Sequence, residues 1–355
     1  MSALDYARCT RDLLTWYESH YRALPWRRSR DAYRIWISEI MLQQTRIEAV
    51  LPYYERFLHE CPDVQSLASL PEERLLKLWE GLGYYSRARN LQKAARIIVA
   101  DYDGVLPADY EKLLALPGIG EYTAGAIASI AYDISVAAVD GNVMRVLARL
   151  MCDDTDVLSS GAKRHFTALV ARMLPDTHAG RFNQALMELG ETVCIPSGNP
   201  NCAACPWCAY CKAKKNGRID TLPVRAKKKP RRIENRTVAV VIIHGETPRV
   251  LLHKRAANGL LANLWELPNA LQEDEPLPRS IATACNAPSK LPQAKHIFSH
   301  VEWHMQGRLY HMPSSALPSG YRAVSLTELQ QDYALPSAFR AYAALLPSLL
   351  QKEDL

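Results

Sequence analysis

The chain has 355 residues, of which 48% are hydrophobic and 23% charged, and its formal net charge is +6. This length allows two or three domains with separate cores, and the composition is that of an ordinary soluble globular protein. No apolar run approaches the roughly 18 residues that span a bilayer, and the polar start does not resemble a secretory signal. We therefore expect a cytoplasmic protein without a membrane partner. We also expect a monomer.

Helical periodicity runs through most of the chain up to about residue 192. It is carried by YRIWISEIMLQQTRIEAVLPYYERFL, ERLLKLWEGLG, RNLQKAARIIVADY, DGNVMRVLARLM, KRHFTALVARML and RFNQALMELGETV. From about residue 237 the texture changes to the short β-type runs RTVAVVIIHG, RVLLHKR and GRLYHM, which Pro- and Gly-containing loops separate. We therefore expect an all-α domain over residues 1–193, with a helix-hairpin-helix near 112–131, and an α+β domain over 237–355.

The stretch LPGIGEYTAGAIA, residues 116–128, places Gly118 and Gly120 directly before an alanine-rich helical segment. Glycines allow positive φ, and the N–H groups that start the next helix favour an anion. A helix ending at Leu116 and a second helix after Gly120 would present Gly118, Ile119 and Gly120 to a DNA phosphate. A simple turn between two helices fits the same residues equally well.

Two acidic residues, Glu39 and Asp140, are candidates for carboxylate chemistry. Glu39 lies in the apolar helical surround of residues 36–41, which is expected to raise its pKa and keep it protonated. Asp140 and Asn142 stand at the entry to the helical segment VMRVLARL. The plain alternative for Asp140 is a helix N-cap, and the plain alternative for Glu39 is an exposed position on a helix.

Five of the nine cysteines, Cys194, Cys202, Cys205, Cys208 and Cys211, fall within 18 positions. In a chain without an export signal this clustering favours metal over disulfides, so we expect a metal-bound loop over residues 194–211. Four thiolates suit either zinc or a [4Fe–4S] cluster, and spacing alone does not choose between them.

A basic stretch follows the cysteines. Residues 212–236 hold eleven Lys/Arg and two acids, and we expect them to form a linker. Within it, residues 227–232 suit either solvent or a phosphate backbone.

LPGIGEYTA, VDGNVMR and the cysteine cluster together resemble the endonuclease III superfamily of helix-hairpin-helix DNA glycosylases. LPWRRSRDAYRIWISEIMLQQT and GLGYYSRARNL make the resemblance specific to the adenine DNA glycosylase family, and LLANLWELP and HIFSH extend it over nearly the whole chain. The resemblance implies a monofunctional N-glycosylase of base-excision repair. Its partner would be double-stranded DNA in which adenine faces 8-oxoguanine or guanine, and the protein would be associated with the nucleoid when bound to that DNA.

The resemblance also implies roles for single residues. Glu39 would protonate adenine N7, and Asp140 would stabilise the oxocarbenium-like sugar, with Tyr122 and Asn142 positioning it. Bifunctional members hold a lysine where this chain has Tyr122, and a phenol forms no Schiff base. The flipped adenine and the gap it leaves would be held by Trp26, Arg27, Leu42, Gln44, Ile47 and Tyr84.

For the cysteines, the family pattern implies a [4Fe–4S] cluster held by Cys194, Cys202, Cys205 and Cys211. This chain departs from the common C-x6-C-x2-C-x5-C spacing by one extra residue after Cys194, and Cys208 is a fifth candidate ligand. The cluster would order a loop that carries Lys212, Lys214 and Lys215 against DNA.

The C-terminal domain resembles a Nudix fold without its catalytic carboxylates. Trp265 stands six positions after Gly259, where the Nudix signature has Glu, and no Arg-Glu-x2-Glu-Glu follows. The resemblance implies that Phe298, Ser299 and His300 recognise 8-oxoguanine; an inert stabilising domain is the plain alternative.

Three other functions compete with this interpretation. An endonuclease III-like glycosylase/lyase acting on oxidised pyrimidines is opposed by Tyr122 and by the extra domain. A Nudix hydrolase fused to a DNA-binding module lacks its carboxylates, and a non-catalytic DNA-binding module leaves Glu39 and Asp140 without a role.

Overall fold

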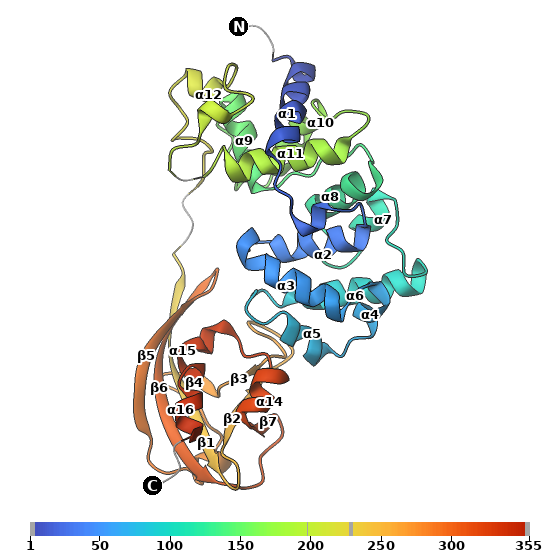
Figure 1. The fold of residues 1–355 in the computed structure, drawn as a ribbon. Coiled ribbons are helices and arrows are strands. Elements are labelled where there is room, and N and C mark those ends of the chain that lie inside the picture. The colour runs from blue at the N-terminus through green and yellow to red at the C-terminus, as the bar shows by residue number, and fades with distance from the viewer. Residues whose placement is uncertain (1–3, 197, 227–229, 352–355) are drawn as a thin grey trace. The chain divides into compact units, whose positions relative to one another are not determined.

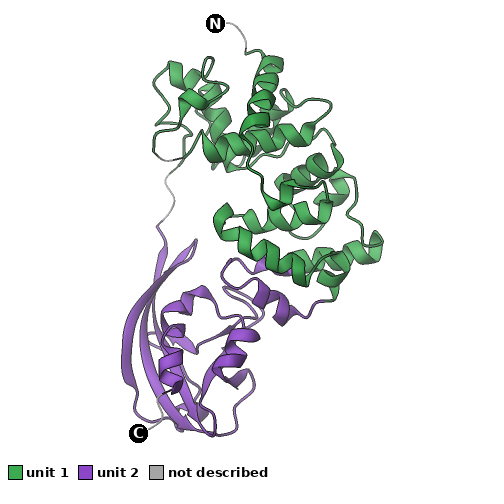
Figure 2. Ribbon diagram, viewed as in Figure 1, with its two compact units in different colours: residues 1–69, 90–227 green, residues 70–89, 228–355 purple. Residues whose placement is uncertain are grey.

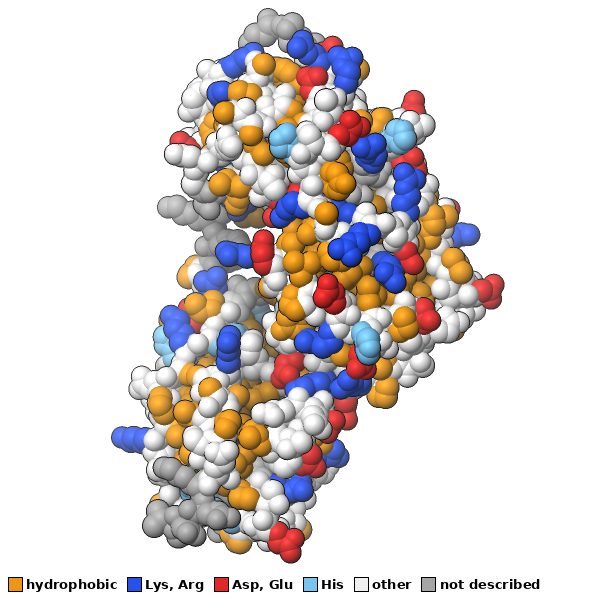
Figure 3. All heavy atoms as spheres, in the orientation of Figure 1, with side chains coloured by type: hydrophobic (Ala, Val, Ile, Leu, Met, Phe, Trp, Pro, Cys, Tyr) orange, Lys and Arg blue, Asp and Glu red, His pale blue; other side chains and the backbone are white. Residues whose placement is uncertain are grey.

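The computed structural model describes residues 4–196, 198–226 and 230–351, and it divides into two compact units. The first unit comprises residues 1–69 and 90–227, and the second comprises residues 70–89 and 228–355 (Figure 2). Within the described residues, no helix is long and apolar enough to cross a membrane. On the face shown in Figure 3, Lys and Arg side chains are interspersed with acids.

The first unit is helical, as the periodicity predicts (Figure 1). Its helices before the hairpin are α1 (Tyr6–His20), η1 (Pro25–Arg27), α2 (Ala32–Leu42), α3 (Ile47–Glu60), α4 (Val64–Ser69) and most of α6 (Ser86–Asp101). After these come α7 (Tyr110–Leu114), α8 (Glu121–Tyr132), α9 (Gly141–Met151), α10 (Ala162–Ala171), α11 (Ala179–Thr192), η2 (Cys202–Ala204) and α12 (Lys212–Lys215).

The long helical pattern from Tyr33 to Leu58 is broken into two helices. α2 ends at Leu42 and α3 begins at Ile47, and between them Gln44 adopts a left-handed conformation with φ 60°. The helical hydrophobic spacing continues through this break, which only the backbone conformation reveals.

The second unit is a mixed seven-stranded sheet with helices. Its strands are β1 (Arg232–His244), β2 (Arg249–Lys254), β3 (Trp265–Glu266), β4 (Asn269–Leu271), β5 (Ser289–Ile297), β6 (Val301–Pro313) and β7 (Tyr321–Val324). The main order is β3-β2-β1-β6-β5; β4 pairs with β1 and β7 with β2. The helical elements are α5 (Glu72–Leu78), α13 (Arg279–Ala282), α14 (Leu326–Gln331), η3 (Ser337–Phe339), α15 (Arg340–Ala343) and α16 (Leu346–Gln351).

The central strands β1 and β6 run parallel over thirteen paired positions, and their alternating side chains enter two cores. On one face Val238, Val240, Trp303 and Met305 pack with residues of α14 to α16. On the other face a smaller core, which includes Val241, joins residues of α13. This arrangement confirms the expected α+β, Nudix-like class.

Strand β5, which pairs antiparallel with β6, is not covered by any of the β-type runs in the sequence. Its sequence is polar and contains Pro292, and most of its side chains are exposed or half-buried. The register with β6 shifts between Lys290 and Gln293. Proline is tolerated at such an edge position because no ladder hydrogen bond has to be donated there.

The segment 70–89 groups with the second unit, whereas the prediction places it in the helical domain. Lys77 Nζ donates to the carbonyl oxygens of Leu329 and Tyr333 at 3.1 and 3.0 Å, and Glu80 accepts from the Leu335 N–H. Of the predicted linker 212–236, residues 227–229 lie outside the described residues, and α12 and the start of β1 occupy its two ends.

Candidate active site

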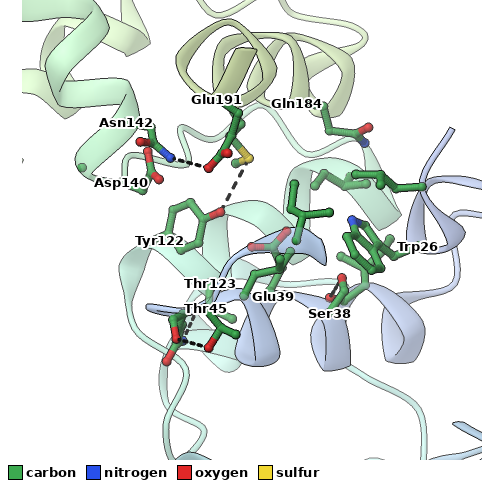
Figure 4. Close-up of a pocket in the computed structure, with 18 of the residues that line it drawn as sticks. Trp26, Ser38, Glu39, Thr45, Tyr122, Thr123, Asp140, Asn142, Gln184 and Glu191 are labelled. Atoms are coloured by element: carbon green, nitrogen blue, oxygen red, sulfur yellow. Dashed lines mark hydrogen bonds between the residues drawn. The ribbon is translucent and has the colours of Figure 1, made fainter. Parts of the chain in front are cut away.

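A cavity of about 520 Å³ in the first unit gathers side chains from α2, α8, α9 and α11 (Figure 4). Ten of the predicted site residues line it: Trp26, Arg27, Glu39, Leu42, Gln44, Ile47, Gly120, Tyr122, Asp140 and Asn142. Tyr84, which the resemblance assigns to the same task as Gln44, is not among the lining residues and belongs to the second unit. The cavity brings together two carboxyl groups that are about a hundred positions apart in the chain.

Glu39 projects into this cavity from a helix that is buried along most of its length. α2 begins after Asp31, whose carboxylate accepts from the Arg34 N–H at 2.9 Å, and Glu39 is 6% exposed. Burial raises the pKa of Glu39 to about 7, the Tyr122 hydroxyl opposes the shift and Asp140 adds to it. Its Oε2 has no hydrogen-bond partner among the described residues. The Glu39 carboxyl is therefore suited to hold a proton near neutral pH.

Asp140 is the N-cap of α9, and its Oδ1 accepts from the Val143 N–H at 2.8 Å. Burial raises the pKa of Asp140, while the Val143 N–H and the Arg145 guanidinium lower it. Asp140 can be both a helix cap and a pocket residue, because the capping hydrogen bond fixes its carboxylate at the cavity wall. A carboxyl group that accepts from a backbone N–H thus faces the same space as one whose pKa is raised to about 7.

Tyr122 lies in the first turn of α8, and its hydroxyl is 3.6 Å from Met187 Sδ. Burial, together with the carboxyl groups of Glu39 and Asp140, raises its pKa well above the usual value, so the phenol stays neutral. Lys163 is a pocket-lining lysine, and its ammonium is 2.9 Å from Glu121 Oε2.

The residues assigned to the base pocket have structural partners as well. The buried Trp26 ring meets Tyr54 edge-on at 5.2 Å. Arg27 Nη2 donates to Glu188 Oε2 at 2.7 Å, and Arg22 Nε donates to the other oxygen of Glu188 at 2.6 Å. Glu188 is fully buried, so this ion pair fixes the guanidinium of Arg27 beside the cavity.

Gln44 and Tyr84 share an unusual backbone conformation. Both are non-glycine residues with positive φ, 60° and 47° respectively, and both side chains are exposed. Left-handed residues outside glycine are uncommon and concentrate at tight turns and functional sites.

The hairpin departs slightly from its predicted limits, since α7 ends at Leu114, two residues early. Gly118 has φ 77°, and a Cβ there would lie 2.7 Å from Asn90 Cβ, so a side chain is excluded on two grounds. Ile119 is buried and its N–H donates to the Leu116 carbonyl, so Ile119 anchors the turn. Gly120 is the N-cap of α8, whose first N–H groups have no partner within the helix.

The five clustered cysteines line a second cavity of the first unit together with Arg149. Arg149 Nη1 donates to Cys194 Sγ at 3.4 Å, and Lys214 Nζ donates to Cys208 Sγ at 2.7 Å. Burial raises the pKa of the Cys205 thiol to about 12. Within the described residues, no three Cys, His or acidic side chains are gathered closely enough for one metal ion. The donor set nevertheless fits an iron–sulfur cluster, whose several irons separate its thiolates further than a single ion does.

Several pocket residues are not indicated by any sequence motif, and they include Ser38, Lys163, Gln184, Met187 and Glu191. Three of them lie on α11, where Gln184 accepts from the Tyr17 hydroxyl at 2.9 Å. The polar residues Gln184, Glu188 and Glu191 recur at helical spacing within an otherwise largely buried helix. This polar stripe was the available signal, because a buried helix face rarely carries polar groups without partners or a function.

In the second unit, the predicted recognition residues occupy the turn between β5 and β6. The Phe298 ring packs edge-on against Trp303 at 4.8 Å and His296 at 4.5 Å, while Ser299 and His300 are exposed. Phe298 therefore anchors the turn, and the exposed Ser299 hydroxyl lies 3.4 Å from His300 Nδ1.

The Nudix-like sheet has no catalytic acid at the position where the Nudix signature requires one. Trp265 is buried in β3. The neighbouring Glu266 is also buried, and both of its oxygens accept from Arg255 Nη1, at 2.9 and 2.8 Å. The Glu266 carboxylate therefore forms a structural ion pair with Arg255.

Comparison with known proteins defines the class. Residues 37–172 match the family described as HhH-GPD superfamily base excision DNA repair protein, and residues 238–345 match the NUDIX domain. A solved thermostable thymine-DNA glycosylase superposes with a TM-score of 0.55 and 27% identity, over 59% of this chain and 97% of that one. The first unit is therefore a helix-hairpin-helix base-excision fold.

The curated relatives narrow the class further. Adenine DNA glycosylase of Rattus norvegicus is 35% identical over 95% of this chain and 78% of its own length. The enzyme of the same name from Homo sapiens is 34% identical over 94% of this chain and 74% of its own. The chain belongs to the adenine DNA glycosylase family.

Proposed function

We propose that the protein removes adenine that faces 8-oxoguanine or guanine in duplex DNA, and that it does so as a monofunctional glycosylase of base-excision repair. The observation that carries this proposal is the pair of unlike carboxyl groups in one cavity, Glu39 with its raised pKa and the capping Asp140. Cleavage of an N-glycosidic bond needs an acid for the departing base and a negative charge near the cationic sugar.

In this mechanism the flipped adenine enters the cavity, and the Glu39 carboxyl donates its proton to N7 of the base. The bond between the base and C1′ then breaks, and the Asp140 carboxylate stabilises the oxocarbenium-like sugar. A water molecule then adds to C1′ and loses a proton. Because Tyr122 is a neutral phenol and supplies no amine, the product is an abasic site with an intact strand. The side chains of Trp26, Arg27, Leu42 and Ile47 would hold the base, and Gln44 and Tyr84 would occupy the gap in the duplex.

The cysteines would hold a [4Fe–4S] cluster through Cys194, Cys202, Cys205 and Cys211. Such a cluster supplies a rigid cross-link in a loop with little core of its own. Arg149, 4% exposed, binds the carbonyl of Ile195 at 2.9 Å and the thiol of Cys194, which prepares the loop for it. Lys212, Lys214 and Lys215 of α12 directly follow Cys211 and would meet DNA phosphates.

The base opposite the adenine would be read by the turn Phe298–His300. The exposed Ser299 hydroxyl donates or accepts, which suits the N7 hydrogen or the C8 oxygen of 8-oxoguanine.

A single-turnover assay tests the whole proposal. Duplexes would carry one 8-oxoguanine:adenine pair, one guanine:adenine pair or one oxidised pyrimidine, and products would be resolved with and without alkali. We expect adenine release from the first two and alkali-dependent breakage. Release of the oxidised pyrimidine, with breakage before alkali, would instead establish the glycosylase/lyase alternative.

A further inference from the structure

Glu191 places a third carboxyl group at the wall of the cavity. It lies one residue before the end of α11, lines the same space as Asp140 and Tyr122, and is exposed to solvent. Its Oε1 accepts from Asn142 Nδ2 at 3.1 Å (Figure 4). The mechanism above gives this side chain no task.

The backbone around Glu191 is fixed against the start of α9. Gly190 allows this approach, because a Cβ at residue 190 would lie 2.9 Å from Asn142 Cβ. Arg145, 2% exposed, donates through Nη2 to the Gly190 carbonyl at 2.9 Å and through Nε to the Cys194 carbonyl at 2.8 Å. The position of the Glu191 Cα relative to Asp140 is therefore set by buried contacts.

The Asn142 amide is held at both ends. Its Nδ2 donates to Glu191, and its Oδ1 accepts from Arg145 Nη1 at 2.9 Å. This pair of bonds defines one amide orientation and excludes the flipped one, since Arg145 has no acceptor and a carboxylate has no donor.

We infer that Glu191 is a positioning residue for the glycosylase reaction, which fixes the Asn142 amide and adds a negative charge beside Asp140. The inference rests on the proposed roles of Asp140 and Asn142. The added charge makes it harder to ionise Asp140, and in the free protein it contributes to the raised pKa of that carboxyl.

The other charged or titratable groups that line the cavity are Arg22, Arg27, Glu39, Tyr122 and Lys163, and the buried Arg145 acts on Asp140 from outside the lining. None of these is changed when Glu191 is replaced, so a shift in the ionisation of Asp140 on replacement reports the Glu191 charge.

The test uses single-turnover excision at saturating enzyme, followed from pH 5 to 9, so that duplex affinity does not enter the rate. Glu191→Gln keeps an acceptor for Asn142 and removes the charge, Glu191→Ala removes both, and Glu191→Asp is the conservative rescue. Glu55→Gln, an exposed change on α3 outside the cavity, is the matched control.

At low pH the rate should fall because Asp140 becomes protonated. We expect the midpoint of this fall, the acid limb, to lie about 0.5 pH unit lower in Glu191→Gln and Glu191→Ala, as expected for the loss of one nearby negative charge. The plateau rate should fall about tenfold only in Glu191→Ala, as expected for a lost orienting contact, and Glu191→Asp should restore the limb. If both variants keep the wild-type limb and plateau, or lose only thermal stability, the inference is wrong. A wild-type protein that releases no adenine would instead overturn the proposed function.

Discussion

Glu39 and Asp140 face one cavity from α2 and α9, but only Asp140 has a backbone donor, the Val143 N–H at 2.8 Å. Glu39 Oε2 is buried without a hydrogen-bond partner among the described residues, and its pKa is raised to about 7. This difference in surroundings assigns the acid role to Glu39 and the anionic role to Asp140.

Excision should therefore fall as the pH rises through about 7, because Glu39 then loses its proton. Glu39→Gln should lower the single-turnover rate by about 10²–10⁴-fold, the usual contribution of a general acid. The variant should also lose the fall in rate above about pH 7. Asp140→Asn keeps the helix cap, since Asn caps as well as Asp, so its loss of rate reports chemistry alone. Wild-type turnover by either variant, with duplex binding intact, would contradict the assigned role.

The raised pKa of Glu39 also predicts a pH-dependent stability. The folded state binds this proton more tightly than the unfolded state, so stability is lost as the pH rises from about 4.5 through about 7. Glu39→Gln removes the cost of ionising this buried carboxyl. The free energy of unfolding of the variant, relative to that of the wild type, should therefore rise by up to about 3 kcal/mol across that pH range. Denaturant unfolding at pH 4.5 and pH 8 measures it. If the stability difference between the variant and the wild type is the same at both pH values, Glu39 is not desolvated.

Tyr122 predicts the absence of strand cleavage. Wild-type protein should give abasic sites that break only after alkali, and borohydride should trap no adduct, because a phenol forms no Schiff base. Lys163 lines the same cavity, so any trapped adduct should disappear in Lys163→Ala. A trapped adduct that survives in that variant, with breakage before alkali, would point to a lyase.

The cysteines predict a coloured protein with about four irons per chain, the content of the family's cluster type. Cys208→Ser should keep the visible absorption, because the thiol of Cys208 is bound by Lys214, whereas Cys202→Ser should bleach it. Absorption and metal analysis of the purified variants decide the matter. Stoichiometric zinc in a colourless protein would overturn the cluster, and bleaching by Cys208→Ser would overturn the ligand set.

Recognition of the opposite base should depend on the turn at residues 298–300. Ser299→Ala should reduce the preference for 8-oxoguanine:adenine over guanine:adenine by about 1–3 kcal/mol, the usual contribution of a base contact. Phe298→Ala combined with it should reduce the preference further, but Phe298 packs on Trp303, so melting must be measured alongside. A double variant that is folded and retains the full preference would exclude this turn as the reader.

Local sequence was sufficient wherever a short motif determines its own geometry. Gly118 requires a backbone with positive φ and no side chain, and Asp140 caps the helix that follows it, so both were placed by their neighbours in the chain. The change of periodicity near residue 237 separated the helical and α+β classes for the same reason.

Only the tertiary structure decided which distant groups meet. Glu39, Asp140 and Glu191 come from three helices, and their common cavity depends on packing that no local pattern records. The close approach of α11 to α9 depends on Gly190, which in the sequence is an ordinary helix glycine. Phe298 likewise reads as a free aromatic in the turn until Trp303 is seen beneath it. The sequence by itself determined the class of chemistry through residue types at short spacing, whereas the pKa values and partners depend on burial, which only the folded chain creates.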